Sequence, residues 1–216
     1  MMSQPAALRT PSSVRRPLRV GITGGIGSGK SVVCKIFEVL GIPIYYADER
    51  AKWLMVNDLN LMNAIRASFG NSTYDANGQL NRSYLADKVF HDEQQLQRLN
   101  ALVHPAVARD SESWNALQVG IPYTLREAAL IYEAGIDKQL DKVIVVTAPL
   151  EVRIQRVMMR DRAPREAVEA RISKQMPASE KVQRADFVIY NDGTQSLIRQ
   201  VLKGHNQLCD LYNATT

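Results

Sequence analysis

The chain has 216 residues, of which 45% are hydrophobic and 23% charged, so it is long enough for one hydrophobic core with an inserted subdomain. No run approaches the roughly 20 consecutive apolar residues of a membrane-spanning helix, so no membrane association is expected. The formal net charge of +5 arises in the N-terminal segment, because the first nineteen residues hold four arginines and no acid, whereas the rest holds 23 basic and 22 acidic residues. This distribution argues against nucleic-acid binding by the folded part.

Residues 1–17 are rich in Ser, Pro, Ala and Arg, and we predict that they form a disordered N-terminal tail. A transit peptide is the alternative interpretation of this composition. The segment lacks the apolar stretch of a secretory signal peptide. The two cysteines lie far apart, which suits a reducing cytoplasm. We therefore expect a cytoplasmic protein, a monomer or small homo-oligomer.

The next feature is a glycine-rich segment between a predicted strand, residues 18–22, and a predicted helix, residues 31–40. It matches the pattern G-x-x-x-x-G-K-S, and the strand–loop–helix context is typical of a phosphate-binding loop, the P-loop. Glycines let backbone N–H groups approach phosphate oxygens, and the helix N-terminus adds a favourable dipole. Lys30 would then reach the β- and γ-phosphates, and the Ser31 hydroxyl would ligate Mg²⁺. The predicted nucleotide-binding residues of the loop are Gly25, Ile26, Gly27, Ser28, Gly29, Lys30, Ser31 and Val32.

Residues 42–46 predict a second strand, and Pro43 favours a position at the edge of a sheet. Asp48 follows directly. Ligands of open α/β sheets bind outside the carboxyl ends of the strands, so Asp48 and the P-loop would share one crevice. If a phosphate of the bound nucleotide is transferred to a hydroxyl group, Asp48 would orient that hydroxyl and take its proton. Alternatively, Asp48 would cap the following helix.

Residues 57–117 lose strand character and show helical spacing of apolar residues, which predicts a helical insertion. Asp92 and Gln95 resemble a capping box within it. Strands are predicted at residues 121–126, 142–147 and 187–190, with helices at residues 149–159 and 196–211. This alternation predicts a parallel sheet, five-stranded and covered by helices in three α/β/α layers.

The reaction class follows from what surrounds the P-loop. The sequence has no Asn-Lys-x-Asp segment, which argues against a GTPase, and strand 142–147 ends without the acid of a motor ATPase. A basic segment from residue 160 to 176 favours a small-molecule kinase whose mobile lid brings arginines over the phosphates.

Five segments together resemble the dephospho-CoA kinase family over about residues 18–205. They are the P-loop, the stretch 40–48 that ends in Asp48, the segment 100–105 with His-Pro, the lid pattern 156–175, and the segment 185–193. The resemblance implies a P-loop kinase fold and transfer of the ATP γ-phosphate to the ribose 3′-hydroxyl of dephospho-CoA, the last step of coenzyme A biosynthesis. A kinase for another small acceptor, such as a nucleoside or nucleotide, is the alternative.

The resemblance also assigns roles. ATP is the co-substrate and Mg²⁺ the cofactor. The catalytic residues would be Asp48, as the base, with Lys30 and Arg160. Further ATP-binding residues would be Arg156, Asn191 and Gly193, and the acceptor would contact Asp48, His104, Glu127 and Leu130. The nucleotide-binding core would comprise residues 18–56 and 118–216, with a lid at about 157–177, and residues 57–117 would form the CoA-substrate-binding insertion.

The sequence departs from the family pattern at several places. Tyr46 replaces the first acid of an Asp-Ala-Asp triplet, so that carboxylate is missing. The family's Pro-Leu-Leu-x-Glu segment appears within residues 128–133 without its proline, and the preceding Arg126 and Glu127 are unusually polar for this strand. Glu127 would hold a magnesium-bound water or pair with an arginine.

Overall fold

The computed structural model describes residues 15–90 and 92–214. The predicted disorder of residues 1–14 lies outside this part. Within the last residues of the predicted tail, Arg16 donates hydrogen bonds of 2.8 and 3.0 Å to the two carboxylate oxygens of Asp141. This end of the chain therefore lies against the core.

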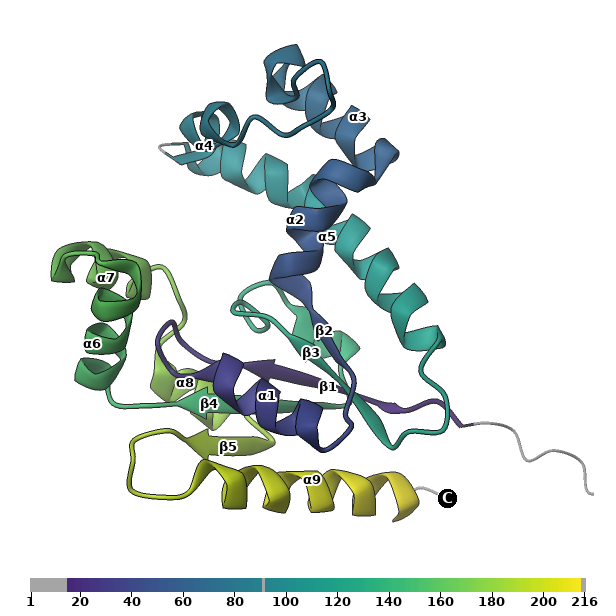
Figure 1. Ribbon diagram of the computed structural model, residues 1–216, viewed down its shortest axis with the longest axis vertical. Helices are drawn as coiled ribbons and strands as arrows, with labels where there is room; N and C mark the ends of the chain where they lie inside the picture. Colours follow the sequence, from purple (N-terminus) through teal and green to yellow (C-terminus); the bar gives the residue numbers. More distant parts are fainter. Residues whose placement is uncertain (1–14, 91, 215–216) are drawn as a thin grey trace, which may run out of the picture.

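Five parallel strands form one sheet in the order β2-β3-β1-β4-β5 (Figure 1). The strands are β1 (Leu18–Thr23), β2 (Ile44–Tyr46), β3 (Tyr123–Glu127), β4 (Lys142–Thr147) and β5 (Phe187–Tyr190). The prediction of five parallel strands is confirmed, as is the edge position of β2. Strands β2 and β3 each begin two residues later than predicted.

Nine α-helices occur within the described residues. They are α1 (Lys30–Val39), α2 (Ala47–Asn57), α3 (Leu59–Phe69), α4 (Arg82–Phe90), α5 (Glu93–Ala116), α6 (Leu150–Asp161), α7 (Arg165–Ile172), α8 (Ala178–Gln183) and α9 (Leu197–Ala214). Two short 3₁₀ turns accompany them, Asn71–Thr73 and Ile136–Gln139. None of these helices is both long enough and apolar enough to cross a membrane.

The sheet is buried on both faces. Along β4, Ile144 and Val146 pack into the core cluster beneath α1 and α9, whereas Val143 and Val145 pack into the cluster on the opposite face, with α5 and residues around α8. A continuous β-branched run suits a strand with two apolar faces, which is why its sequence does not alternate. The α/β/α layering predicted from the sequence is thereby confirmed.

Helices α2 to α5 pack on one another and rise from one end of the sheet, at the top of Figure 1. Side chains cap the N-termini of α5 and α3: the Asp92 carboxylate accepts from the backbone N–H groups of Gln94 and Gln95, as the sequence suggests, and Asp58 does the same for α3. Pro105 does not end α5, which continues through it to Ala116. The segment 57–117 is thus largely helical, but the helices begin already at Ala47.

Asp110 of α5 ties this helical cluster to the sheet. Its carboxylate accepts 2.9 and 2.6 Å hydrogen bonds from Arg50 of α2 and a 2.6 Å bond from the hydroxyl of Tyr45 on β2. The Arg50 hydrogen bonds, opposed by burial and reinforced by Tyr45, hold the pKa of Asp110 below its ordinary value. One carboxylate therefore fixes the positions of α2, α5 and β2.

We expect Asp110→Ala to lower the free energy of unfolding by about 2 kcal/mol at pH 7, because two donors lose their acceptor. The folded-state pKa is lowered, so this contribution is complete above the unfolded pKa and is lost as pH falls through the folded pKa, below 3.8. Urea unfolding from pH 7 to pH 3 measures the difference. Asp87→Ala, which removes an exposed acid of α4, is the control. A difference that stays constant over this pH range would contradict the assignment.

Candidate functional site

The P-loop joins β1 to α1 in a conformation that requires glycine at two positions. Gly27 and Gly29 have φ angles of +79° and +93°, which side chains disfavour. A Cβ atom on Gly27 would lie 2.5 Å from the backbone oxygen of Arg153, and one on Gly29 would lie 2.0 Å from the amide nitrogen of Asn191. The loop is therefore packed tightly against Arg153 and Asn191, and a ligand can approach it only from the opposite side.

Arg153 of α6 supports this loop, and the sequence analysis missed it. Its side chain is buried, and Nε donates a 3.0 Å hydrogen bond to the backbone oxygen of Ile26. Its guanidinium also fills the space where a Cβ atom on Gly25 would lie. The spacing of Arg153, Arg156 and Arg160 at i, i+3 and i+7 is the signal that could have revealed a shared helix face.

Lys30 lies at the bottom of the cavity next to two acids. Its ammonium donates a 3.0 Å hydrogen bond to the backbone oxygen of Gly24 and lies 3.9 Å from a carboxylate oxygen of Glu127. Burial lowers the pKa of Lys30, and the negative charges of Glu127 and Asp48 partly offset this. Such a desolvated cation favours a site for a multiply charged anion.

Strand register explains why both acids face the P-loop. Glu127 ends β3, where it is opposite Ile22 of β1 on one side and Tyr46 of β2 on the other. Asp48 lies two residues beyond Tyr46, in the first turn of α2. Burial raises the pKa of Glu127, and the nearby charge of Lys30 opposes that rise. Among the described residues, Glu127 therefore pairs with the lysine of the P-loop and with no arginine.

Asp48 does not act as a helix cap. The N-cap of α2 is Tyr46, which makes no side-chain cap, and the Asp48 carboxylate makes no hydrogen bond with any residue that the structure describes. Its side chain is exposed. The capping alternative is thereby weakened, and Asp48 has a carboxylate available for another partner.

Tyr46, the departure from the family triplet, is engaged with α1. Its hydroxyl donates a 2.7 Å hydrogen bond to Glu38, and its ring lies 5.8 Å from the ammonium of Lys35. The missing carboxylate is thus replaced by a contact between β2 and α1.

A cavity of about 260 Å³ opens above the P-loop. Its walls come from the loop, from α6 and from the segments after β3 and α7. It is lined by residues 26–31, Ala129, Arg156, Val157, Arg160 and Gln175. Gln175 also accepts a 2.9 Å hydrogen bond from the backbone N–H of Ile26. The last residue of the lid pattern 156–175 therefore contacts the P-loop.

The two predicted lid arginines differ in their present partners. Arg156 donates to the backbone oxygen of Asn191 at 3.1 Å, and the amide of Asn191 in turn donates to the backbone oxygen of Ser28 at 2.9 Å. Arg160 is paired with Asp161 at 2.7 Å, and its side chain is 62% exposed. Arg156 therefore connects loop and β5 turn, whereas Arg160 is free to exchange a surface carboxylate for another anion.

Several predicted site residues do not line this cavity. Asp48 and Glu127 lie beside it, close enough to act on Lys30 electrostatically. The other predicted site residues that are not among its lining residues are Gly25, Val32, His104, Leu130, Asn191 and Gly193. Val32, His104 and Leu130 are exposed, and Gly193 has a positive φ of 86° in the turn after β5.

A buried lysine braces the wall of the cavity and was also missed. Lys181 of α8 is 1% exposed; it donates a 3.1 Å hydrogen bond to the backbone oxygen of Ala129 and lies 2.7 Å from Glu133. Glu133 accepts a 2.9 Å bond from the backbone N–H of Met176, directly after the lid glutamine. Burial opposes these contacts, but the Lys181 and backbone hydrogen bonds leave the pKa of Glu133 below its ordinary value.

We expect Lys181→Met to lower the free energy of unfolding by about 2–4 kcal/mol, because Glu133 loses its buried counter-charge and the Ala129 carbonyl loses one of its donors. Lys35→Met, which removes one partner of an exposed pair with Glu38, should change the free energy of unfolding far less. Urea unfolding at pH 7 compares the two variants. Equal effects would show that the buried lysine contributes no more than a surface one.

A phosphate-binding loop between β1 and α1, a parallel sheet in this strand order and arginines on α6 define the class of P-loop kinases. The model of the family described as dephospho-CoA kinase matches residues 18–196. The chain belongs to the dephospho-CoA kinase family.

Curated relatives and solved structures agree with this membership. The chain is 37% identical over 186 residues to the dephospho-CoA kinase of Bacteroides fragilis, covering 86% of this chain and 90% of that relative. It is 41% identical over 191 residues to that of Chlorobaculum tepidum, with 86% and 91% covered. A crystal structure of a Thermus thermophilus protein superposes with a TM-score of 0.78 at 34% identity, covering 89% of this chain and 98% of that one. A dephospho-CoA kinase from Campylobacter jejuni gives a TM-score of 0.67 at 26% identity, covering 89% and 97%.

Proposed function

We propose that the protein transfers the γ-phosphate of ATP to the ribose 3′-hydroxyl of dephospho-CoA, giving coenzyme A and ADP. The observation that carries this proposal is the arrangement of Lys30 between the P-loop and the acids Asp48 and Glu127, in a chain of this family. A cation at the terminal phosphate beside an acid for the acceptor is what phosphoryl transfer needs.

Each group has a defined task in this reaction. The P-loop backbone and Lys30 bind the β- and γ-phosphates and neutralise charge that develops during transfer. The Asp48 carboxylate accepts the hydrogen bond of the acceptor hydroxyl, orients it towards the γ-phosphorus and receives its proton. Arg160 exchanges Asp161 for the transferred phosphate, and Arg156 with Asn191 holds the loop from the side of β5.

The oxygen donors at this place suit Mg²⁺. Ser31 lines the cavity beside the P-loop, and the carboxylates of Asp48 and Glu127 lie close to Lys30. Hydroxyl and carboxylate oxygens are the ligands that this ion prefers, together with phosphates and water. Bound there, the ion would supply charge neutralisation between the β- and γ-phosphates. Ser31 would be its ligand, and Glu127 would hold a water on it.

The remaining parts of the proposal concern the acceptor and the surroundings. The helical cluster α2 to α5, including His104 of α5, and Leu130 after β3 would form the wall against which dephospho-CoA lies. Only a small-molecule acceptor is expected, with no nucleic acid or membrane partner, since basic and acidic residues balance beyond the first nineteen positions. We place the enzyme in the cytoplasm, as a monomer or small homo-oligomer.

An ADP-release assay with ATP and Mg²⁺ tests the proposal. ADP should form at a rate that rises strongly when dephospho-CoA is added, and the product should comigrate with coenzyme A. Adenosine, AMP and shikimate are the comparison acceptors. If a nucleoside or nucleotide is phosphorylated faster than dephospho-CoA, the alternative kinase function replaces this one. If the rate of ADP formation is the same with and without each acceptor, both functions are rejected.

A further inference from the structure

Arg126 of β3 carries a charge that has no partner in the described part of the chain. Its guanidinium makes neither an ion pair nor a hydrogen bond there, and Nε is buried with no acceptor. The guanidinium carbon lies 6.0 Å from the ring centre of Tyr45. Burial lowers the pKa of Arg126, and Tyr45 and the negative charge of Glu112 only partly offset this effect.

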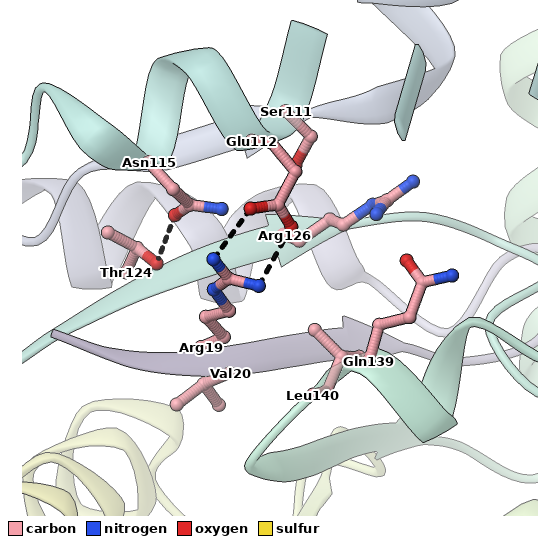
Figure 2. A pocket seen from close by; sticks show the side chains of 9 residues that line it. All are labelled: Arg19, Val20, Ser111, Glu112, Asn115, Thr124, Arg126, Gln139 and Leu140. Carbon is pink, nitrogen blue, oxygen red and sulfur yellow. Dashed lines mark hydrogen bonds and ion pairs between the residues drawn. The ribbon is translucent and has the colours of Figure 1, made fainter. Parts of the chain in front are cut away.

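The carboxylate of Glu112, which lines the same cavity as Arg126, is already paired with another arginine. Glu112 of α5 accepts hydrogen bonds of 2.8 and 2.6 Å from Arg19, one on each oxygen. Figure 2 shows this pair on the β1 side of a small cavity, with the guanidinium of Arg126 directed away from it and past the end of β3. Two arginines thus line the same cavity, but one is neutralised and the other is not.

The position of Arg126 places its charge beside the proposed acceptor site. Arg126 is opposite Tyr45 of β2, and the next residue is Glu127, which lies beside Lys30. His104 of α5 is near enough that, after burial, the charge of Arg126 lowers the pKa of its imidazole. The guanidinium therefore lies between β3 and α5, at the carboxyl end of the sheet, where ligands of open α/β sheets bind.

An unpaired, partly buried cation destabilises a fold, so such a group is typical of positions where a ligand supplies the missing charge. The guanidinium has donors in a planar fork that matches two oxygens of a phosphate group. The acceptor of the proposed function carries such groups, because a diphosphate links its adenosine to the pantetheine arm.

We propose that Arg126 binds the diphosphate of the acceptor and so makes the enzyme prefer an acceptor that carries one. This inference rests on the proposed function, since it takes dephospho-CoA as the acceptor. It assigns Arg126 to acceptor binding and not to the chemical step, which Asp48 and Lys30 perform.

The test compares Arg126→Met with Arg19→Met, the paired arginine of the same cavity, by steady-state kinetics at saturating ATP. Arg126→Met should raise the KM for dephospho-CoA about 10- to 100-fold, the loss expected for charged hydrogen bonds, while kcat and the KM for ATP change less than about threefold. Adenosine, which has the same ribose hydroxyl but no diphosphate, should inhibit competitively with dephospho-CoA and with the same Ki in wild type and variant. Arg126→Lys keeps the charge without the fork and should give an intermediate KM.

Thermal unfolding without ligands separates binding from a structural role. Arg126→Met should unfold at the wild-type temperature or above it, since it removes an unpaired charge, whereas a structural arginine would lower that temperature when removed. An unchanged KM for dephospho-CoA, an equal weakening of adenosine, or a lowered unfolding temperature would overturn the inference while wild-type activity upholds the proposed function. A wild-type enzyme without activity on dephospho-CoA would overturn both.

Discussion

Asp48→Asn is expected to lower kcat for dephospho-CoA phosphorylation by about 10²- to 10⁴-fold, the range typical of losing a general base. The amide keeps the size of the side chain but cannot receive the proton of the acceptor hydroxyl. Because the Asp48 carboxylate makes no hydrogen bond with any described residue, the fold should tolerate this change. The affinity for a fluorescent ATP analogue should stay the same, because the P-loop binds the phosphates through other residues.

Glu49→Gln is the matched control for this prediction. Glu49 is the next residue of the same helical turn and is also exposed, but it is one position further from β2. Its substitution should leave kcat within about twofold, as is usual for surface changes. A kcat of Asp48→Asn close to that of Glu49→Gln would show that Asp48 is not the base, and Glu127→Gln would then be the variant to measure.

Lys30→Met should lower kcat/KM for ATP by about 10²- to 10³-fold, which is the effect of removing one preorganised donor to a developing negative charge. Methionine keeps the aliphatic stem and removes the ammonium, which lies at the bottom of the cavity and has a pKa lowered by burial. The loss should therefore appear in catalysis and not in stability. Steady-state kinetics with dephospho-CoA at saturation gives the value.

Lys35→Met, on the exposed side of the same helix, controls for a general effect of removing a lysine from α1. Its kinetic constants should match the wild type. An undiminished kcat/KM in Lys30→Met would contradict the assignment of the P-loop lysine to the γ-phosphate, whatever the family of the chain.

Local pattern was enough to predict the sheet and the P-loop. The β-branched run of β4 predicts a strand buried on two faces, and Pro43 predicts the edge position of β2; both are confirmed by the strand order. The glycines of the P-loop are needed for close approach, and that need is visible in their pattern. These features depend on neighbours in sequence.

The missed residues depend on contacts between distant segments. Arg153 reaches the P-loop across 127 positions of chain, and Lys181 reaches Ala129 across 52. Local spacing indicates at most that the α6 arginines share a helix face; it does not indicate which distant segment such a residue contacts. Pro105 favours a helix end by sequence, yet α5 continues because Val103, Ala106 and Val107 are buried on both sides of it. Similarly, whether Asp48 caps its helix or faces a substrate depends on where α2 begins, which tertiary packing decides.

The central claim is that the P-loop holds the terminal phosphate of ATP while Asp48 aims the ribose 3′-hydroxyl of the acceptor at it. A crystal structure with dephospho-CoA and a non-hydrolysable ATP analogue measures this directly. We predict the Asp48 carboxylate at about 2.6–3.2 Å from the 3′-hydroxyl, with the γ-phosphorus in line beyond it. A hydroxyl held by Glu127 instead, with Asp48 turned to solvent, would contradict the account.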